Sequence, residues 1–348
     1  MTKITNQLGA MATAAGALVA VGLLMLMVVM VEAGTARAAC PGKNGGIAYT
    51  SYDAPFPKGD SEIYTIKPDG SGKRQLTHND KDDLDPAYSP DSKKLAYVGQ
   101  DGPKGDLEIY TINASGGDKF QVTHNAVDEE WLAYSPSGKR IAYTDLTPNE
   151  PGPHIYSIKA GGGGKRLVAR NGFTPSYSPD GKRIAYACLG RTFRIDTDIC
   201  TISVRRDDKL AKFIPEKPVG NALHDVLHHK VHVTNNDTDD SNPDYSPDGD
   251  RIVYEGFEGG WGKKQDEDGS TNIYTIKAGG GGNFNVTKSP KNDSIWNAWP
   301  SYSPDGEKIA YFYVPDGEIY TINARGGGKS RVTNNDAYPI GLSWGCRP

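Results

Sequence analysis

The sequence predicts an all-β fold, a six-bladed β-propeller with four antiparallel strands in each blade. Three patterns that recur together along the chain predict it. The first is a hairpin, P-S-Y-S-P-D-G-K-R-I-A-Y at Pro175–Tyr186, in which Ser-Pro-Asp-Gly forms a tight turn between two extended runs. The second is a strand of the type I-Y-T-I, and the third is a short L/V-T strand after a Gly-rich turn. A four-stranded unit repeated every ~40–50 residues is typical of propeller blades.

The number of copies predicts the number of blades. The hairpin has four further clear copies, at Pro86–Tyr97, Leu132–Tyr143, Pro243–Tyr254 and Pro300–Tyr311. The I-Y-T-I strand occurs six times, at Ile63–Ile66, Ile109–Ile112, Ile155–Ile158, Ile199–Ile202, Ile273–Ile276 and Ile319–Ile322. The fourth strand follows each of these, at Gln75–Thr77, Gln121–Thr123, Leu167–Ala169, His232–Thr234, Asn285–Thr287 and Arg331–Thr333.

The two ends of the repeat region predict how the ring closes. Gly45–Tyr49 resembles a second strand with no first strand before it, and Pro339–Trp344 resembles a first strand with no second strand after it. Paired in space, they complete one blade. Cys40 and Cys346 then flank the place of the missing turn, so we expect a disulfide between them. Such a link closes a very long loop and contributes about 4–5 kcal/mol in the chain-entropy model.

The other two cysteines lie in one blade. Cys188 ends its second strand, and Cys200 lies in its third strand where other copies carry Tyr, so a second disulfide is expected there. The alternative, in which Cys40 pairs with Cys188 or Cys200, would link blades several positions apart in the ring. Four paired cysteines are typical of an exported protein.

Residues 1–38 are predicted to be a signal peptide. Lys3 is the only charge before an apolar run from Ala10 to Val31, and Ala36-Arg37-Ala38 gives a cleavage site. The run is also long enough to cross a bilayer, so a retained anchor is the alternative. We therefore expect an exported protein in the periplasm, in the cell envelope or outside the cell.

Residues 39–348 are predicted to form a single propeller domain with insertions near 205–231 and 255–272. The mature domain is expected to be a monomer that does not insert into a membrane. The net charge of −4 provides no basic field for nucleic acid, so no nucleic-acid partner is expected.

The S-P-D-G-K-x-I-A-Y, I-Y-T-I and L/V-T patterns resemble the WD40-like repeat of the TolB-type six-bladed propellers. The resemblance covers the chain from about Gly45 to Cys346. The TolB family also carries an α/β domain before its propeller, for which the sequence ahead of Gly45 leaves no room. The resemblance therefore implies the fold of the propeller but not a complete role in the Tol system.

Motifs that would indicate catalysis are incomplete. Gly341–Gly345 fits G-x-S-x-G, but only three residues follow it, so Asp and His partners cannot come later in the chain. We interpret it as part of the closing strand. His224–His229 and His232 resemble a zinc-protease pattern, but the repeat places His232 on a strand instead of the required helix. A surface loop with incidental histidines is the interpretation, and a Zn²⁺ or Mn²⁺ site is the alternative.

The residues just before each first strand are expected to rim one mouth of the central channel. They combine acidic and amide side chains with aromatic ones: Asp83, Asp85, Glu130, Trp131, Thr174, Asp240, Asn242, Asn297, Trp299 and Tyr338. Such a rim would suit a basic or amide-rich segment of a protein partner, with Trp and Tyr as anchors. Its carboxylates would also suit Ca²⁺, which prefers oxygen ligands. Solvated loop charge is the alternative.

The sequence thus predicts an exported, non-catalytic binding protein that presents a rigid propeller face to a protein or peptide. The alternative is a metal-dependent propeller enzyme, a lyase or a lactonase-type hydrolase, that uses the central channel.

Overall fold

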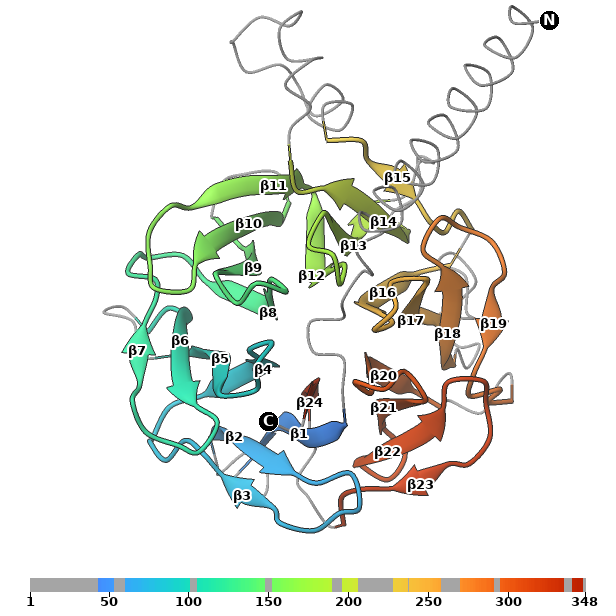
Figure 1. Ribbon diagram of the computed structural model, residues 1–348, viewed down its shortest axis with the longest axis horizontal. Coiled ribbons are helices and arrows are strands. Elements are labelled where there is room, and N and C mark those ends of the chain that lie inside the picture. The colour runs from blue at the N-terminus through green and yellow to red at the C-terminus, as the bar shows by residue number, and fades with distance from the viewer. Residues whose placement is uncertain are drawn as a thin grey trace, which may run out of the picture. The chain divides into compact units, whose positions relative to one another are not determined.

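The computed structural model describes residues 43–52, 60–100, 105–147, 152–189, 196–205, 228–236, 238–257, 270–290, 295–334 and 340–346. In these residues, 24 strands form six sheets of four antiparallel strands. The sheets are arranged as blades in a ring, with the first strand of each blade nearest the centre (Figure 1). The predicted all-β, six-bladed propeller is confirmed.

Each blade contributes one strand to each of four layers. The innermost strands are β24 (Ile340–Cys346), β4 (Asp83–Tyr88), β8 (Glu129–Tyr134), β12 (Gly172–Tyr177), β16 (Asp240–Tyr245) and β20 (Asn297–Tyr302). The second strands are β1 (Asn44–Tyr52), β5 (Lys94–Gly99), β9 (Arg140–Asp145), β13 (Arg183–Leu189), β17 (Arg251–Phe257) and β21 (Lys308–Tyr313). The third strands are β2 (Ser61–Ile66), β6 (Glu108–Asn113), β10 (His154–Lys159), β14 (Thr197–Ser203), β18 (Thr271–Lys277) and β22 (Glu318–Asn323). The outermost are β3 (Arg74–Gln75), β7 (Phe120–Gln121), β11 (Arg166–Arg170), β15 (Val231–His232), β19 (Phe284–Asn285) and β23 (Ser330–Arg331).

The Ser-Pro-Asp-Gly segment forms the predicted turn between the first and second strands. Gly181 N–H donates to Ser178 O at 2.8 Å, which closes the turn, and Gly181 has the positive φ of +69° that glycine tolerates. The Ser178 hydroxyl donates to Asp180 Oδ1 at 2.7 Å and accepts from Arg183 N–H at 2.9 Å. The turn is therefore specified by its own side chains, which explains why it recurs as a sequence motif.

The ring closes as predicted, by pairing of β24 with β1. Ile47 lies opposite Trp344 and Ala48 opposite Ser343. Ser92 replaces glycine in the adjacent turn, at a φ of +53°, and its hydroxyl accepts a hydrogen bond of 2.8 Å from Cys346 N–H. A side chain at this turn position thus ties the closing strand to the next blade.

One of the two predicted disulfides lies within the described residues. Cys188 on β13 and Cys200 on β14 are bonded, with their Cα atoms 5.9 Å apart. Cys346 is also disulfide-bonded. Its predicted partner, Cys40, lies outside the described residues.

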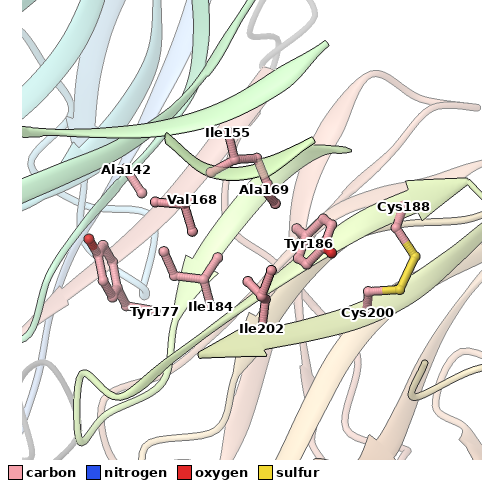
Figure 2. Packing of buried hydrophobic residues seen from close by; sticks show 10 residues of the cluster. All are labelled: Ala142, Ile155, Val168, Ala169, Tyr177, Ile184, Tyr186, Cys188, Cys200 and Ile202. Atoms are coloured by element: carbon pink, nitrogen blue, oxygen red, sulfur yellow. A yellow bond between two sulfur atoms is a disulfide. The ribbon is translucent and has the colours of Figure 1, made fainter. Parts of the chain in front are cut away.

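The hydrophobic core lies between neighbouring blades. The largest buried side chains are one tyrosine from the second strand of every blade: Tyr49, Tyr97, Tyr143, Tyr186, Tyr254 and Tyr311. Figure 2 shows one such interface, where Ala142, Ile155 and Val168 of the β8–β11 blade pack against Ile184 and the disulfide-bonded blade. Burying an isoleucine side chain contributes about 1.5–3 kcal/mol, so the repeated interface stabilises the ring at every junction.

The predicted domain limits remain predictions. The chain divides into two units, Met1–Ala36 and Arg37–Pro348, and all the described strands belong to the second. Residues 1–38 and most of both predicted insertions (206–227 and 258–269) lie outside the described residues. Within the described part of the chain, no helix has the length and apolar character needed to cross a membrane.

Candidate binding site in the central channel

The six inner strands enclose a cavity of about 230 Å³ along the axis of the ring. Its lining begins at the third residue of each inner strand from β4 to β20 and continues to the prolines of the Ser-Pro turns. These prolines are Pro90, Pro179, Pro247 and Pro304. The cavity therefore runs from one face of the propeller towards the other.

Every inner strand is irregular at the same point. One residue in each adopts a left-handed backbone conformation, with φ between +48° and +58°: Asp85, Trp131, Thr174, Asn242, Trp299 and Gly341. The pairing register shifts at this residue, for example between Glu130 and Ala133, as in a β-bulge. We call these six residues the channel mouth. Five of them are not glycine, and bulky or β-branched residues rarely adopt this conformation, which marks the mouth as a candidate functional site.

The sequence-predicted rim residues at the mouth are therefore Asp85, Trp131, Thr174, Asn242 and Trp299. All five line the cavity. They lie within the inner strands, although the sequence pattern had placed them in the loops ahead of those strands. The bulge explains why these residues lie within strands, because pairing with the second strand occurs both before and after the irregular residue.

The two mouth tryptophans are each held by a carboxylate. The backbone N–H of Trp131 donates to Asp85 Oδ2 at 3.1 Å, and the backbone N–H of Trp299 donates to Glu255 Oε2 at 3.1 Å. The Trp131 ring lies 5.9 Å from that of Phe173. Both indole side chains are half-buried, so part of each remains accessible for stacking against a cation or an amide.

Asp244 lies deeper in the channel and joins three blades. It accepts hydrogen bonds from Tyr302 N–H at 2.9 Å and from the Ser176 hydroxyl at 3.1 Å. Burial raises the pKa of Asp244 to about 6, although these hydrogen bonds act in the opposite direction. The carboxyl group therefore ionises close to neutral pH.

Three more carboxyl groups near the mouth have raised pKa values. Burial, together with the negative charges of Asp85 and Asp128, raises the pKa of Glu130 to about 7. Burial also raises the pKa of Asp85 and of Glu255. A cation placed among these groups would favour their ionised forms, because its positive charge attracts the carboxylates.

Four other predicted rim residues do not line the cavity. One of them, Glu130, is half-buried next to Trp131. Asp83, Asp240 and Asn297 are buried in the links between blades. Asn79 Nδ2 donates to Asp83 Oδ2 at 2.7 Å, and Asn236 Nδ2 donates to Asp240 Oδ2 at 3.0 Å. These side chains hold neighbouring blades together. Tyr338 lies outside the described residues.

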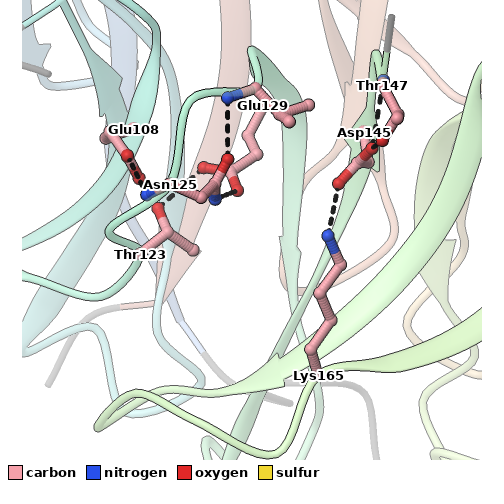
Figure 3. Close-up of polar contacts among 8 residues, drawn as sticks. Glu108, Thr123, Asn125, Glu129, Asp145, Thr147 and Lys165 are labelled. Atoms are coloured by element: carbon pink, nitrogen blue, oxygen red, sulfur yellow. Dashed lines mark hydrogen bonds and ion pairs between the residues drawn. The ribbon is translucent and has the colours of Figure 1, made fainter. Parts of the chain in front are cut away.

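Figure 3 shows one of these links in detail. The Thr123 hydroxyl and the Asn125 amide both donate to Glu129, while Asn125 N–H donates to Glu108. Glu129 is the first residue of β8 and Glu108 the first of β6, so the link joins two blades. The donors belong to an L/V-T-x-N pattern that four of the six blades carry in the sequence.

Sequence reasoning missed Asp244 and Glu255. Asp244 occupies a position that holds a small residue in the other repeats, such as Ala87, Ala133 and Ser176. That departure from the repeat was the available signal. Glu255 lies on β17, a second strand, and no feature of the sequence indicates that it reaches the mouth.

Comparison with known proteins bears on the fold. No family model matches the sequence. A TolB homologue of Chlorobium luteolum is 41% identical over 56 residues, which are 16% of this chain and only 12% of that protein. The TolB structure from Acinetobacter baumannii matches with a TM-score of 0.64 and 17% identity, over 88% of this chain and 68% of that one. A putative TolB from Agrobacterium tumefaciens matches with a TM-score of 0.59 and 17% identity, over 85% and 90% of the two chains.

The fold is that of a TolB-like six-bladed β-propeller. The same architecture extends beyond TolB, since the structure of a nidogen–laminin complex matches with a TM-score of 0.59 and 9% identity, over 86% of this chain and 98% of that one. Fold similarity at these identities does not transfer a partner or an activity.

The remaining motifs take ordinary places in this TolB-like propeller. Gly341–Gly345 lies within β24, and the Ser343 hydroxyl accepts a hydrogen bond of 3.0 Å from Tyr88 N–H, as expected of a strand residue. His224 lies outside the described residues. In the described part of the channel, no three carboxyl or imidazole groups come within 4.8 Å of one another.

Proposed function

We propose that this protein is an exported, non-catalytic binding protein that receives a basic or amide-rich segment of a protein or peptide partner in the mouth of its central channel. The observation that carries the proposal is the channel mouth itself. Strained residues, half-buried tryptophans and carboxyl groups of raised pKa are gathered there on a rigid ring.

The size of the cavity limits what enters it. About 230 Å³ is smaller than a typical pocket for a drug-sized ligand, but it holds one long side chain or the end of a chain. The rest of the partner would lie across the face of the propeller. Rigid blades present this face without the entropic cost of ordering a loop.

The chemistry of the mouth selects the partner's charge. Asp85, Glu130 and Asp244 would pair with an ammonium or guanidinium group, and Trp131 and Trp299 would pack against its aliphatic part. The Cys188–Cys200 disulfide is typical of an oxidising compartment, which supports export.

A peptide array tests the proposal directly. Purified protein is expected to retain peptides rich in Lys, Arg, Asn and Gln over acidic peptides of equal length. Asp244→Asn combined with Trp299→Ala should weaken binding of a retained peptide at least ~10-fold, and lowering the pH from 8 to 5.5 should weaken the wild type. The reason is that Glu130 and Asp244, with pKa values raised to about 7 and about 6, become protonated and lose their attraction for a cation.

The matched control is Asp83→Asn, which removes a carboxyl group outside the cavity and should leave peptide binding unchanged per folded molecule. Equal retention of acidic and basic peptides would contradict the proposal. The enzyme alternative has its own measurement. A stoichiometric transition metal retained by the oxidised protein after dialysis, with lyase or lactonase activity, would support it instead.

A further inference from the structure

The β12–β15 blade carries a cluster of side chains of metal-binding types. They lie on the second, third and fourth strands of the blade, whereas the channel mouth is formed by the first strands. Cys188 lies on β13, Cys200 on β14 and His232 on the outermost strand, β15. One ligand atom from each lies within 4.8 Å of the other two. The strand register explains the proximity, because Cys200 is directly opposite His232.

No other blade carries cysteine or histidine at these three positions. The position of Cys200 holds tyrosine in the other blades: Tyr64, Tyr110, Tyr156, Tyr274 and Tyr320. The position of His232 holds Gln75, Gln121, Leu167, Asn285 and Arg331. Two sulfur ligands and an imidazole therefore replace ordinary blade residues together and in one place. A disulfide alone would need only the two cysteines.

A fourth residue orients the imidazole. His232 Nδ1 lies 3.0 Å from Asp198 Oδ2, and the Thr234 hydroxyl donates to Asp198 Oδ1 at 3.3 Å. A neutral imidazole that donates from Nδ1 carries its lone pair on Nε2. A carboxylate that fixes a histidine in this way is the usual outer partner of a zinc-binding histidine.

Of the three residues in the cluster, only the histidine is partly exposed, so a metal would reach the cluster on its side. Both cysteines are fully buried, whereas the His232 side chain is 11% exposed. Figure 2 shows the disulfide at the edge of the hydrophobic cluster, beside Tyr186. The site thus has two buried sulfur atoms and one partly exposed imidazole.

We propose that reduction of the Cys188–Cys200 disulfide converts this cluster into a Zn²⁺ site formed by both thiolates and His232. In this step a dithiol reductant is oxidised to its disulfide, the Cys188–Cys200 bond breaks, and each cysteine gains one electron and one proton. Zn²⁺ then displaces the two thiol protons into solvent. Water or an anion completes the coordination.

Zinc is the metal that fits these ligands. Two thiolates and an imidazole form a soft-to-borderline set that Zn²⁺ binds in tetrahedral geometry, whereas Ca²⁺ and Mg²⁺ prefer oxygen ligands. In the oxidised protein the sulfurs bond to each other, so the site does not bind zinc. The blade would then exchange one cross-link, the disulfide, for another.

Metal titration of the full-length chain tests the proposal. The protein is reduced with a phosphine that does not chelate metals, in the presence of Zn²⁺, and bound zinc is measured after dialysis. We expect one Zn²⁺ per reduced chain and none in the oxidised chain. Co²⁺ in place of Zn²⁺ should give thiolate charge-transfer absorption with the visible bands of a tetrahedral site.

Three variants locate the site. His232→Gln, which installs the residue of two other blades, should abolish stable zinc binding while the oxidised protein keeps its melting temperature. Asp198→Asn should weaken zinc binding by about 10–100-fold, as expected for an outer partner. Cys40→Ser combined with Cys346→Ser should leave zinc binding unchanged, because it removes only the other cysteine pair.

Four results would overturn the proposal. They are equal zinc content in the reduced and oxidised proteins, unchanged affinity in His232→Gln, loss of zinc in the Cys40→Ser, Cys346→Ser variant, and unfolding of the reduced chain despite excess Zn²⁺. The assay does not involve the channel mouth, so its outcome is independent of the proposed binding function.

Discussion

Two junctions between blades can be compared directly. One joins the β4–β7 and β8–β11 blades, and the other joins the β16–β19 and β20–β23 blades. Each is built around a threonine at the same position of the repeat, Thr123 in the first and Thr287 in the second. Thr123 Oγ1 accepts from Ile109 N–H at 2.8 Å and donates to Glu129 at 2.7 Å. Thr287 Oγ1 accepts from Ile273 N–H at 3.0 Å and donates to Asn272 at 2.7 Å. One junction thus uses carboxyl groups where the other uses amides.

The difference shows that a blade junction needs hydrogen-bond partners more than it needs charge. Glu108 and Glu129 are fully buried next to each other in the first junction, and Asn272 and Asn297 are buried in the second. Burial raises the pKa of Glu129 to about 7, and the nearby charge of Glu108 adds to this effect. Only the carboxyl junction therefore carries a dependence on pH.

The largest expected effect comes from placing a carboxyl group in the amide junction. Asn297 Nδ2 donates to Thr271 O at 2.8 Å and to Ser289 Oγ at 3.0 Å, so Asn297→Asp would bury a charge against two oxygens. We expect a loss of about 3–5 kcal/mol in the free energy of unfolding at pH 8. The loss should be smaller at pH 5, where a protonated Asp regains one donor.

Urea unfolding at the two pH values measures this effect. Asn323→Asp, on the exposed side of β22, is the control and should change the free energy of unfolding by less than ~0.5 kcal/mol. If Asn297→Asp is as stable as the wild type at pH 8, the two junctions are not electrostatically different.

An intermediate effect is expected from removing the shared threonine. Thr123→Val leaves Ile109 N–H and Glu129 without this partner, and we expect a loss of about 2–3 kcal/mol. Thr287→Val should cost a similar amount at pH 5. Above pH 7 the loss in Thr123→Val should exceed that in Thr287→Val, because the ionised Glu129 then loses a donor. Equal losses at every pH, measured by urea unfolding, would show that the threonine acts in the same way in both junctions.

The smallest expected effect is a decrease in the free energy of unfolding of the wild type as the pH rises, which Glu129→Gln should reduce. The folded-state pKa of Glu129, about 7, is raised above its ordinary value of 4.5. The stabilisation linked to its proton is therefore fully present below pH 4.5 and is lost as the pH rises through 7.

Glu129→Gln copies the neutral form, so its free energy of unfolding should fall less between pH 5 and pH 8 than that of the wild type, by about 2 kcal/mol. The measurement is the urea midpoint at several pH values, with Glu307→Gln on an exposed turn as the control. A steeper slope in Glu129→Gln than in the wild type would refute the assignment.

The sequence by itself determined the blade, the number of blades and the closure of the ring. Turns such as Ser178–Gly181 are held by hydrogen bonds between residues at most five positions apart. Local forces of this kind leave a repeated pattern in the sequence, and counting the pattern gives the architecture. The unpaired strands at Gly45–Tyr49 and Pro339–Trp344 then left one way to complete the sixth blade. The pair Cys188 and Cys200 followed from the same alignment.

Only the tertiary structure decided which polar side chains meet in the channel. Ser176 and Asp244 are 68 positions apart in the chain, and Asp244 and Tyr302 are 58 apart, yet each pair is joined by a hydrogen bond. The ring brings them together through blade packing, which leaves no periodic signal at the polar positions. One bulged residue per inner strand then separates Asp85, which lines the channel, from Asp83, which is buried between blades. On a regular strand, residues two positions apart point to the same face, but a bulge between them breaks this rule. The sequence alone therefore could not show that Asp83 and Asp85 have different surroundings.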